Sequence, residues 1–193
     1  MFTDNYIKLS NLFFMGDSYK RFVNAAGNEQ DGYSYNLGSY GIGKYMKSGQ
    51  CRSLVTTMKQ DPNPDNSVCP GVYFGSGSTP ATKADYTLAS PITSGLAITS
   101  PSAVVWSDDG NGKHTACADF TVRNTSQSEI NIYEIGLFSA VQSNYSGYNG
   151  NYSNQWWLTL MERTVLEEPI TIAPGEAKLV TYKITFNQTL NVE

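Results

Sequence analysis

Near its C-terminus the chain reads Leu179-Val180-Thr181-Tyr182-Lys183-Ile184-Thr185-Phe186, and this stretch decides the fold class. Successive residues of an extended strand point to opposite faces, so every second residue from Val180 to Phe186 lies on one side. That side is wholly apolar, and we expect it to face a core. The same period of two occurs in Phe120-Thr121-Val122-Arg123.

Strand-like runs recur through the rest of the chain, separated in most cases by turn residues. Tight turns are predicted at Ser107–Lys113 and at Ala173–Glu176, where Gly and Pro or Asp suit turn conformations. The expected strands cover residues 53–58, 71–75, 95–100, 102–107, 115–123, 129–139, 155–165, 169–173 and 177–187. No segment has a convincing helical pattern. The sequence therefore predicts an all-β fold, an antiparallel β-sandwich that is jelly-roll-like.

The first part of the chain differs in composition from the remainder. Gly and Tyr crowd the segment from Gly32 to Tyr45, and interior glycines disfavour a helix. We therefore expect residues 1–50 to form an irregular, Gly/Tyr-rich N-terminal extension and residues 51–193 to form the β-sandwich domain. The extension either covers a sheet or acts as an arm that reaches a neighbouring subunit.

Composition and charge exclude several classes of partner. The net charge is -4 and no basic stripe occurs, which argues against nucleic-acid binding. No apolar run approaches the roughly 20 residues of a membrane-spanning helix, so we expect no membrane partner. With three cysteines, one histidine and no CxxC pair, we expect no zinc site and no cofactor. A Cys51–Cys69 disulfide is possible, but the odd count and the lack of a visible export signal favour reduced thiols.

Six segments form a recurring set of motifs: Phe74–Pro80, Asp85–Leu88, Phe120–Thr125, Ile132–Phe138, Leu160–Leu166 and Ile170–Glu176. In the order and spacing of these motifs, the chain resembles a structural module of tailed-bacteriophage virions. The motifs extend over about residues 70–187. The resemblance implies a structural or adhesive role in the tail, in the neck or on the capsid surface, and it brings no catalytic residues. It also implies that the chain is made in the host cytoplasm and ends in the virion.

One strand of the matching region carries an acidic residue among apolar neighbours. Glu134 lies between Tyr133 and Ile135, and a buried carboxylate there would need a partner. Arg163 is the candidate, because a guanidinium pairs well with a carboxylate. Three interpretations stay open: Glu134 faces solvent, it pairs with Arg163 across the sheet or between subunits, or it is a catalytic acid.

Other residue patterns that carry chemistry are weak, and we expect no catalytic, cofactor-binding or metal-binding residue. His114 is the only histidine base, and Ser76 and Ser78 lack the context of a hydrolase nucleophile. Asp108, Asp109 and Asn111 match a hairpin turn better than a calcium loop, which needs a closing carboxylate. A glycosidase pair of carboxylates around Glu162, Glu167 and Glu168 is disfavoured, because the last two read as a solvated turn before Pro169.

Aromatic residues supply the candidate contact surface. The segment 143–155 combines Tyr with Ser, Gly and Asn, the composition of adaptable binding loops, and Trp156-Trp157 follows it. This segment is a loop without a ligand, a contact between subunits, or a glycan-binding surface. The candidate interface or ligand-contact residues are Tyr33, Tyr35, Tyr40, Tyr145, Tyr148, Tyr152, Trp156 and Trp157.

Two functions follow from these observations. The first is a non-enzymatic structural protein of a tailed-phage virion. It assembles with copies of itself and other virion proteins into a symmetric oligomer, through sheet edges and aromatic loops. The second is a carbohydrate- or receptor-binding adhesion module whose partner is a glycan of the host surface. An enzyme ranks last, because no acid, base and nucleophile can be assembled from this sequence.

Overall fold

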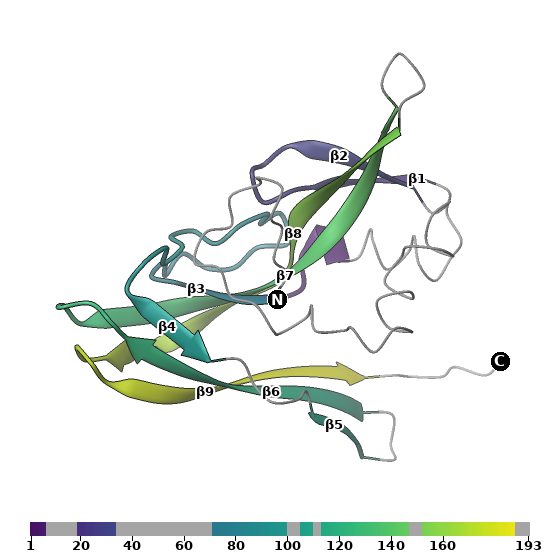
Figure 1. Cartoon of the computed structure of the whole chain (residues 1–193). Helices are drawn as coiled ribbons and strands as arrows, with labels where there is room; N and C mark the ends of the chain where they lie inside the picture. The colour runs from purple at the N-terminus through teal and green to yellow at the C-terminus, as the bar shows by residue number, and fades with distance from the viewer. Residues whose placement is uncertain (7–18, 34–70, 100–104, 110–112, 147–151, 188–193) are drawn as a thin grey trace. The chain divides into compact units, whose positions relative to one another are not determined.

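The computed structural model describes residues 1–6, 19–33, 71–99, 105–109, 113–146 and 152–187, and most of these residues are in strands (Figure 1). Residues 4–6 form a helical turn. The strands are β1 (Tyr19–Val23), β2 (Glu29–Tyr33), β3 (Gly71–Gly75), β4 (Leu96–Thr99), β5 (Val105–Asp108), β6 (Lys113–Asn124), β7 (Ile130–Ser146), β8 (Tyr152–Ile172) and β9 (Ala177–Asn187). The prediction of an antiparallel, all-β chain is confirmed at this level. The strand expected at 53–58 lies outside the described residues.

The chain divides into two compact units, and each unit is built from two separate stretches of sequence. The first comprises Met1–Ser94 with Asn131–Thr171, and the second comprises Gly95–Ile130 with Ile172–Glu193. The chain passes from one unit to the other three times: before β4, at the start of β7 and at the end of β8. The boundary that the sequence suggested at residue 50 lies outside the described residues.

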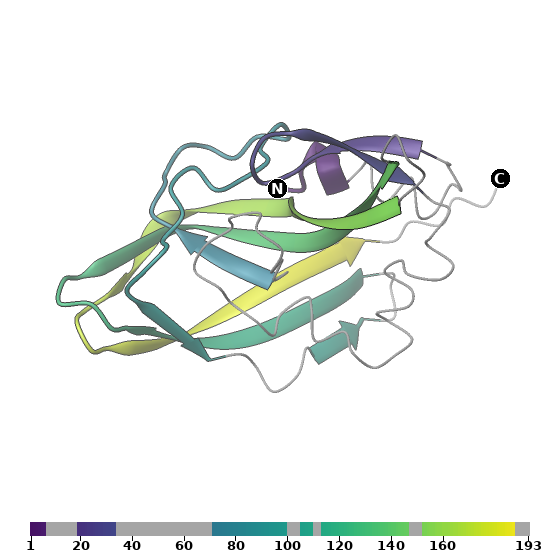
Figure 2. The ribbon, with the colours of Figure 1, turned by 45° about the horizontal axis from the view of Figure 1, so that its top comes forward.

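The first unit contains a sheet in the order β3-β7-β8, in which β7 and β8 run side by side along most of their length (Figures 1 and 2). β3 pairs with β7 in antiparallel register from Gly71↔Phe138 to Gly75↔Glu134. All five residues of β3 are buried. Its apolar centre, Val72-Tyr73-Phe74, therefore forms part of the core, as expected of a short buried strand.

Short extended segments line the outer edges of this sheet. Pro91 forms an isolated antiparallel bridge with Gly75 outside β3, and the Ile92 N–H donates to the Phe74 carbonyl at 3.0 Å. Phe2 forms a similar bridge with Glu162 outside β8. Exposed strand edges invite pairing with other chains, so these short segments protect the sheet where they lie.

A two-stranded hairpin, β1-β2, also belongs to the first unit. Its turn is closed by Asn24, whose side-chain oxygen accepts from the Ala26 and Asn28 N–H groups at 3.0 and 2.9 Å. Gly27 in this turn has φ +81, a left-handed conformation that favours glycine. The hairpin reaches β8, where the Ala25 N–H donates to the Leu158 carbonyl at 2.8 Å.

The core of the first unit lies beside β7. It brings together Tyr73, Leu88, Phe138, Leu158 and Leu160. The rings of Tyr73 and Phe138 meet edge to face with centroids 5.0 Å apart, a favourable geometry for aromatic pairs. At Gly136 an added Cβ would lie 2.8 Å from Leu88, so glycine lets this loop leucine reach the sheet.

The second unit is a sheet centred on β6. β9 pairs with β6 along its length, from Lys113↔Asn187 to Arg123↔Ala177. β4 and β5 pair with the two ends of β6 on its other edge (Figure 2). On β9, Val180 and Tyr182 are buried while Leu179 is 68% exposed, so the predicted core face is confirmed for these residues.

Asn124 joins two turns at one end of the second unit, and it is completely buried. Its side-chain nitrogen donates to the carbonyls of Ser128 and Ile172 at 2.7 and 2.9 Å. Its side-chain oxygen accepts from the N–H of Ser126 at 2.8 Å. The predicted turn at Ala173–Glu176 is confirmed, since the Glu176 N–H donates to the Ala173 carbonyl at 3.0 Å.

One prediction about the strands is wrong. We expected separate strands at 155–165 and 169–173 with a turn at Glu167-Glu168-Pro169, whereas β8 runs unbroken through this region. Glu167 and Glu168 are exposed as expected, but within a strand. β8 is the last strand in the order β3-β7-β8, and an edge strand accepts a proline whose missing N–H would face outward.

Candidate functional site

The loop that follows β3, residues 76–91, folds over a single buried carboxylate, that of Glu134 on β7. Glu134 is 0% exposed. Its Oε1 accepts from the N–H groups of Gly77 and Ser90 at 3.2 and 2.7 Å. Its Oε2 accepts from the Ala89 N–H at 3.0 Å. One side chain thus satisfies backbone donors at both ends of the loop.

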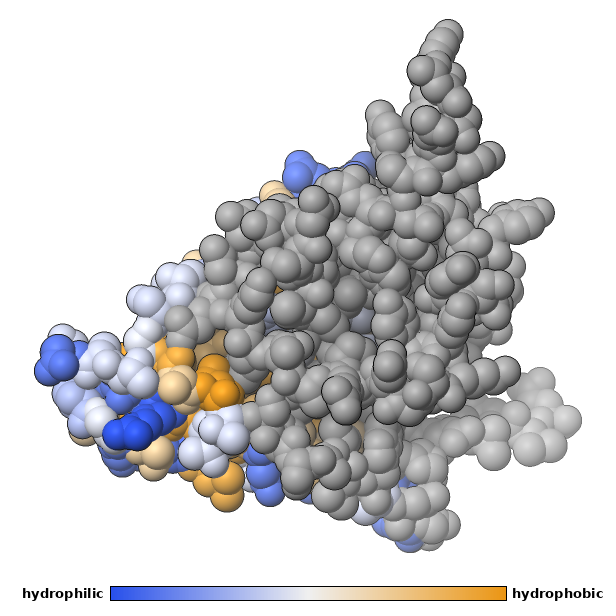
Figure 3. Space-filling model, in the orientation of Figure 1, coloured by the Kyte–Doolittle hydropathy of each residue, from blue (hydrophilic) through white to orange (hydrophobic). Residues whose placement is uncertain are grey.

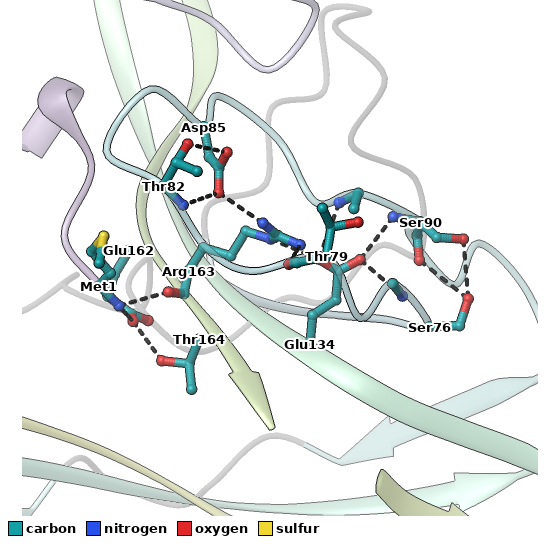
Figure 4. Close-up of polar contacts among 12 residues, drawn as sticks. Met1, Ser76, Thr79, Thr82, Asp85, Ser90, Glu134, Glu162, Arg163 and Thr164 are labelled. Carbon is teal, nitrogen blue, oxygen red and sulfur yellow. Dashed lines mark hydrogen bonds and ion pairs between the residues drawn. The ribbon is translucent and has the colours of Figure 1, made fainter. Parts of the chain in front are cut away.

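Arg163 on β8 completes this arrangement from the other side (Figure 4). Its Nε lies 2.7 Å from Glu134 Oε2, and its Nη1 lies 2.7 Å from Asp85 Oδ2. Its Nη2 donates to the Thr79 carbonyl at 3.0 Å. The guanidinium is almost completely enclosed, with 3% of the side chain exposed. We call Glu134, Arg163 and Asp85 the buried clasp.

Asp85 anchors the middle of the loop to Arg163 and is itself held by Thr82. The Thr82 N–H and hydroxyl donate to the Asp85 carboxylate at 2.9 and 2.7 Å. Burial alone would raise the pKa of Asp85, but the hydrogen bonds from Thr82 and Arg163 outweigh burial and lower it below 3.8. Burial likewise acts to lower the pKa of Arg163, while its bonds to Asp85 and Glu134 raise that pKa above its ordinary value. The geometry therefore keeps this pair charged.

Two glycines give the carboxylate its room. A Cβ at Gly77 would lie 2.6 Å from Glu134 Oε1, closer than any real contact of a Cβ atom. A Cβ at Gly75 would also overlap the carboxylate of Glu134. The backbone must approach the carboxylate closely to donate its N–H groups, so only glycine fits. This explains the Phe74-Gly75-Ser76-Gly77 sequence in physical terms.

The hydrogen-bonding capacity of the Glu134 carboxylate is fully used within the clasp. Glu134 accepts four hydrogen bonds, each from its own chain, and has no exposed surface. A carboxylate in this position cannot reach a substrate, and its hydrogen-bonding capacity is used. What the arrangement does is hold a loop of some fifteen residues against the sheet with charge-assisted bonds.

The predicted pairing partners therefore lie together, and within one chain. Of the three interpretations of Glu134, the solvent-facing one is wrong, because burial in the sheet removes it from water. The sequence did not assign a role to Asp85 or to the loop amides. The Thr82-Lys83-Ala84-Asp85 spacing was an available signal, since a carboxylate three residues after a threonine often closes a turn with it.

Of the eight aromatic candidates, five are placed in strands by their backbone, and three lie outside the described residues. Tyr33 lies in β2, Tyr145 in β7, and Tyr152, Trp156 and Trp157 in β8, with side chains outside the described set. Tyr35, Tyr40 and Tyr148 lie outside the described residues. The segment 143–155 is therefore partly strand, at its two ends, and its contacts stay a prediction.

Large apolar side chains are exposed at few places in the described part of the chain. They are Met1, Tyr86 and Leu179, which are 55%, 42% and 68% exposed. On the face in Figure 3, the coloured surface mixes hydrophilic residues with small groups of hydrophobic atoms. An adhesive apolar surface is thus not assembled from the side chains that the structure describes.

Metal ligation was considered for the turn after β5. Asp109 Oδ1 accepts from the Lys113 N–H at 3.0 Å, and the Asp109 N–H donates to the Lys113 carbonyl at 3.2 Å. The carboxylate thus closes the β5-β6 hairpin, as the turn interpretation expects. Over the described ranges, no group of three or more His, Cys, Asp or Glu side chains is placed to hold a metal ion.

The remaining residues singled out from the sequence fall in different places. His114 lies in β6, paired with Asp108 of β5, and its side chain is outside the described set. Cys117 in β6 is a free, half-buried thiol. Cys51 and Cys69 lie outside the described residues, so their pairing stays open. In the part of the chain that the structure describes, no helix has the length and apolar character needed to cross a membrane.

Compared with known proteins, the chain matches no family model, no curated protein and no solved structure.

Proposed function

We propose that the chain is a non-enzymatic structural protein of a tailed-phage virion. In this proposal it assembles with copies of itself and with other virion proteins into a symmetric oligomer, through sheet edges and aromatic loops. The fold that accompanies it is a jelly-roll-like β-sandwich with an N-terminal arm over residues 1–50. Its station is the tail, the neck or the capsid surface.

The buried clasp is the observation that carries this proposal. Four of the motifs behind the resemblance meet there: Phe74–Pro80, Asp85–Leu88, Ile132–Phe138 and Leu160–Leu166 supply Gly77, Asp85, Glu134 and Arg163. These segments are far apart in sequence, and all four supply groups to the same buried hydrogen-bond network. This supports the resemblance as one of fold, and it favours a role of the motifs in holding a loop over a role in a reaction.

The charged groups of the clasp also fit a structural role. Their mutual bonds leave the loop surface, which is rich in small hydroxylated and alanine residues, facing outward in a fixed shape. Exposed positions include Ser78, Thr79, Thr82 and Lys83. A rigid surface loop loses little entropy when a neighbour binds it, which favours repeated weak contacts in an assembly.

Self-assembly is the first test. The full chain, purified at increasing concentration, is followed by sedimentation velocity, and the largest species is imaged by electron microscopy. We expect a closed oligomer with rotational symmetry, because identical contacts between copies close into rings or point groups. A chain that stays monomeric at every concentration, alone and with the other proteins of its particle, would refute the proposal.

The adhesion alternative makes a different prediction for the aromatic segment. Replacing Tyr145, Tyr148 and Tyr152 together by Ser should weaken assembly if these residues lie between copies. If instead they bind sugar, assembly should be unchanged and binding to an array of bacterial-surface glycans should be lost. Tyr86, exposed on the 76–91 loop, provides a matched control for loss of a surface tyrosine.

A further inference from the structure

Residues 1–5, the N-terminal segment, bind the outer edge of β8 as an added strand. The Arg163 N–H donates to the Met1 carbonyl at 3.0 Å, and the Thr3 N–H donates to the Met161 carbonyl at 3.0 Å. Between these bonds Phe2 forms its bridge with Glu162, and Figure 4 shows Met1 beside Glu162 and Arg163. Pairing of this kind is the way in which extended peptides add to sheet edges.

Two side chains make the docking specific. Thr3 is fully buried, and its hydroxyl lies 2.8 Å from the Leu160 carbonyl and 3.2 Å from the Met161 carbonyl. Asn5 is 3% exposed, and its amide exchanges two hydrogen bonds of 2.8 Å with the backbone of Val23. The edge of β8 accepts the threonine, and the end of β1 at Val23 accepts the asparagine two positions later.

The length of chain between the N-terminal segment and β1 is compatible with either donor, the chain itself or a second copy. Asn5 and Val23 are in contact although they are 18 positions apart in the chain. The twelve residues 7–18 connect Tyr6 to β1, and an extended chain of that length can reach roughly 40 Å. A segment supplied by a second copy would make the same contacts as the chain's own, so local concentration decides between them.

We propose that the outer edge of β8 at residues 160–163 accepts residues 1–5 of a neighbouring copy, so that N-terminal segments are exchanged between subunits in the assembled state. The proposal rests on the function proposed above, which requires that copies of the chain assemble. It adds the donor, the acceptor and the side chains that match them. Main-chain hydrogen bonds and the buried Thr3 and Asn5 side chains, rather than an apolar patch, hold the donated segment. The Met1 ammonium group adds bonds of 2.6 Å to Glu162 Oε1 and to the Arg163 carbonyl.

Disulfide trapping tests the exchange directly. Residues bridged across antiparallel strands have Cα atoms about 4.5–5.5 Å apart, which suits a disulfide. One chain carries Phe2→Cys and another carries Glu162→Cys; the two are mixed and oxidised, and peptides are identified by mass spectrometry. A disulfide between positions 2 and 162 in this mixture is intermolecular, since no chain holds both changes. A single chain with both changes reports whether the segment docks as described.

We expect the intermolecular product to rise at least tenfold as the mixture is concentrated from about 10 µM to about 1 mM, since a short linker gives the chain's own segment an effective concentration on the order of 1 mM. The doubly substituted chain should crosslink at all concentrations. A doubly substituted chain that crosslinks while the mixture never does overturns the exchange. A doubly substituted chain that fails to crosslink overturns the docking itself.

A peptide experiment avoids substitutions in the protein. A fluorescent peptide with the sequence of residues 1–6 is added to the unaltered full chain, and its anisotropy is measured. The peptide should bind by displacing the chain's own segment, and Thr3→Val in the peptide should weaken binding about two- to tenfold, for one lost hydrogen bond. Asp4→Asn is the matched control, because the Asp4 side chain is exposed and its bond to Lys83 uses the backbone N–H.

Sedimentation of the same samples separates the two proposals. Assembly without the intermolecular disulfide and without peptide binding refutes the exchange and leaves the structural function standing. A chain that never assembles refutes both.

Discussion

Replacing Glu134 by glutamine is the sharpest test of the buried clasp, because the change keeps the volume of the side chain. Each carboxylate oxygen accepts two bonds, Oε1 from Gly77 and Ser90 and Oε2 from Ala89 and Arg163. In either orientation, the new amide nitrogen would point at two donors that it cannot satisfy. The substitution therefore removes two hydrogen bonds and the charge that faces Arg163.

The size of the effect follows from burial. Removing one partner of a buried ion pair costs about 3–5 kcal/mol, because the other charge is left without compensation. Here Asp85 still lies 2.7 Å from Arg163 Nη1, so we expect a value near the lower end, about 3 kcal/mol. For a chain of this size each kcal/mol shifts Tm by about 2–4 °C, which gives a decrease of about 6–12 °C.

Urea unfolding followed by circular dichroism measures this change, and Glu168→Gln is the matched control. Glu168 lies exposed on β8, and its substitution should change the free energy of unfolding by less than about 0.5 kcal/mol. Hydrogen exchange at the Gly77, Ala89 and Ser90 amides provides a local reading, and all three should exchange faster in the variant. If Glu134→Gln unfolds within about 0.5 kcal/mol of the native chain with these amides still protected, the clasp does not hold the loop.

A double-mutant cycle assigns the energy to the pair. Arg163→Met alone leaves Glu134 buried with three backbone donors but without its counter-charge. Combined with Glu134→Gln, it should cost less than the sum of the single changes, with a coupling of about 1–3 kcal/mol. Purely additive losses would mean that the two side chains act independently. The double variant should not regain native stability, because at least one loop amide still lacks an acceptor and Asp85 has lost its cation.

Three further substitutions test other parts of the structure. Gly77→Ala should destabilise the chain by about 1–3 kcal/mol in urea unfolding, since its Cβ would overlap Glu134. Gly175→Ala is the control, because space is open there and only the φ of +78 opposes a side chain. An equal loss of stability in the two variants would argue against overlap as the cause. The pKa of Asp85 is lowered on folding, so the ionised carboxylate stabilises the folded chain above pH 3.8. This contribution to the free energy of unfolding is lost as the pH falls through the lower pKa of the folded state. Asp85→Asn should therefore flatten the decline in stability between about pH 5 and pH 2, and an unchanged decline would contradict the assignment. Asn124→Ala should lower Tm by leaving buried turn groups unpaired, at about 2–4 kcal/mol, and a loss below about 0.5 kcal/mol would show that the turns do not depend on it.

Local pattern was enough to predict most strands of this protein. The alternation around Val180 and Tyr182 predicts both the strand and its buried face, because side-chain direction in a strand depends only on the period of two. Turn residues gave the hairpin at Asp109 and the turn at Gly175 for a similar reason, since their chemistry is local. Pro169 misled the prediction, because whether a strand tolerates proline depends on its place in the sheet.

The contacts of the buried clasp could be predicted only in part from local sequence patterns. Glu134 among apolar residues indicated that a buried charge would need a cation, and Arg163 was available as that cation. Nothing local indicated that Asp85 would share the guanidinium or that Gly77 and Ser90 would donate to the carboxylate. Those last contacts join positions 57 and 44 residues apart, and they exist only once β3, β7 and β8 are paired.

By itself, then, the amino-acid sequence determined the all-β class, the face that β9 buries and the requirement for a counter-charge near Glu134. These depend on residue type and on spacing along a few neighbouring positions. Only the tertiary structure decided that the chain forms two units, each from two separate stretches of sequence, that β8 is continuous, and that residues 1–5 line its edge. Such features depend on which distant backbone groups form hydrogen bonds with each other. Nearly every residue has the same backbone N–H and C=O groups, so the sequence gives almost no indication of these pairings.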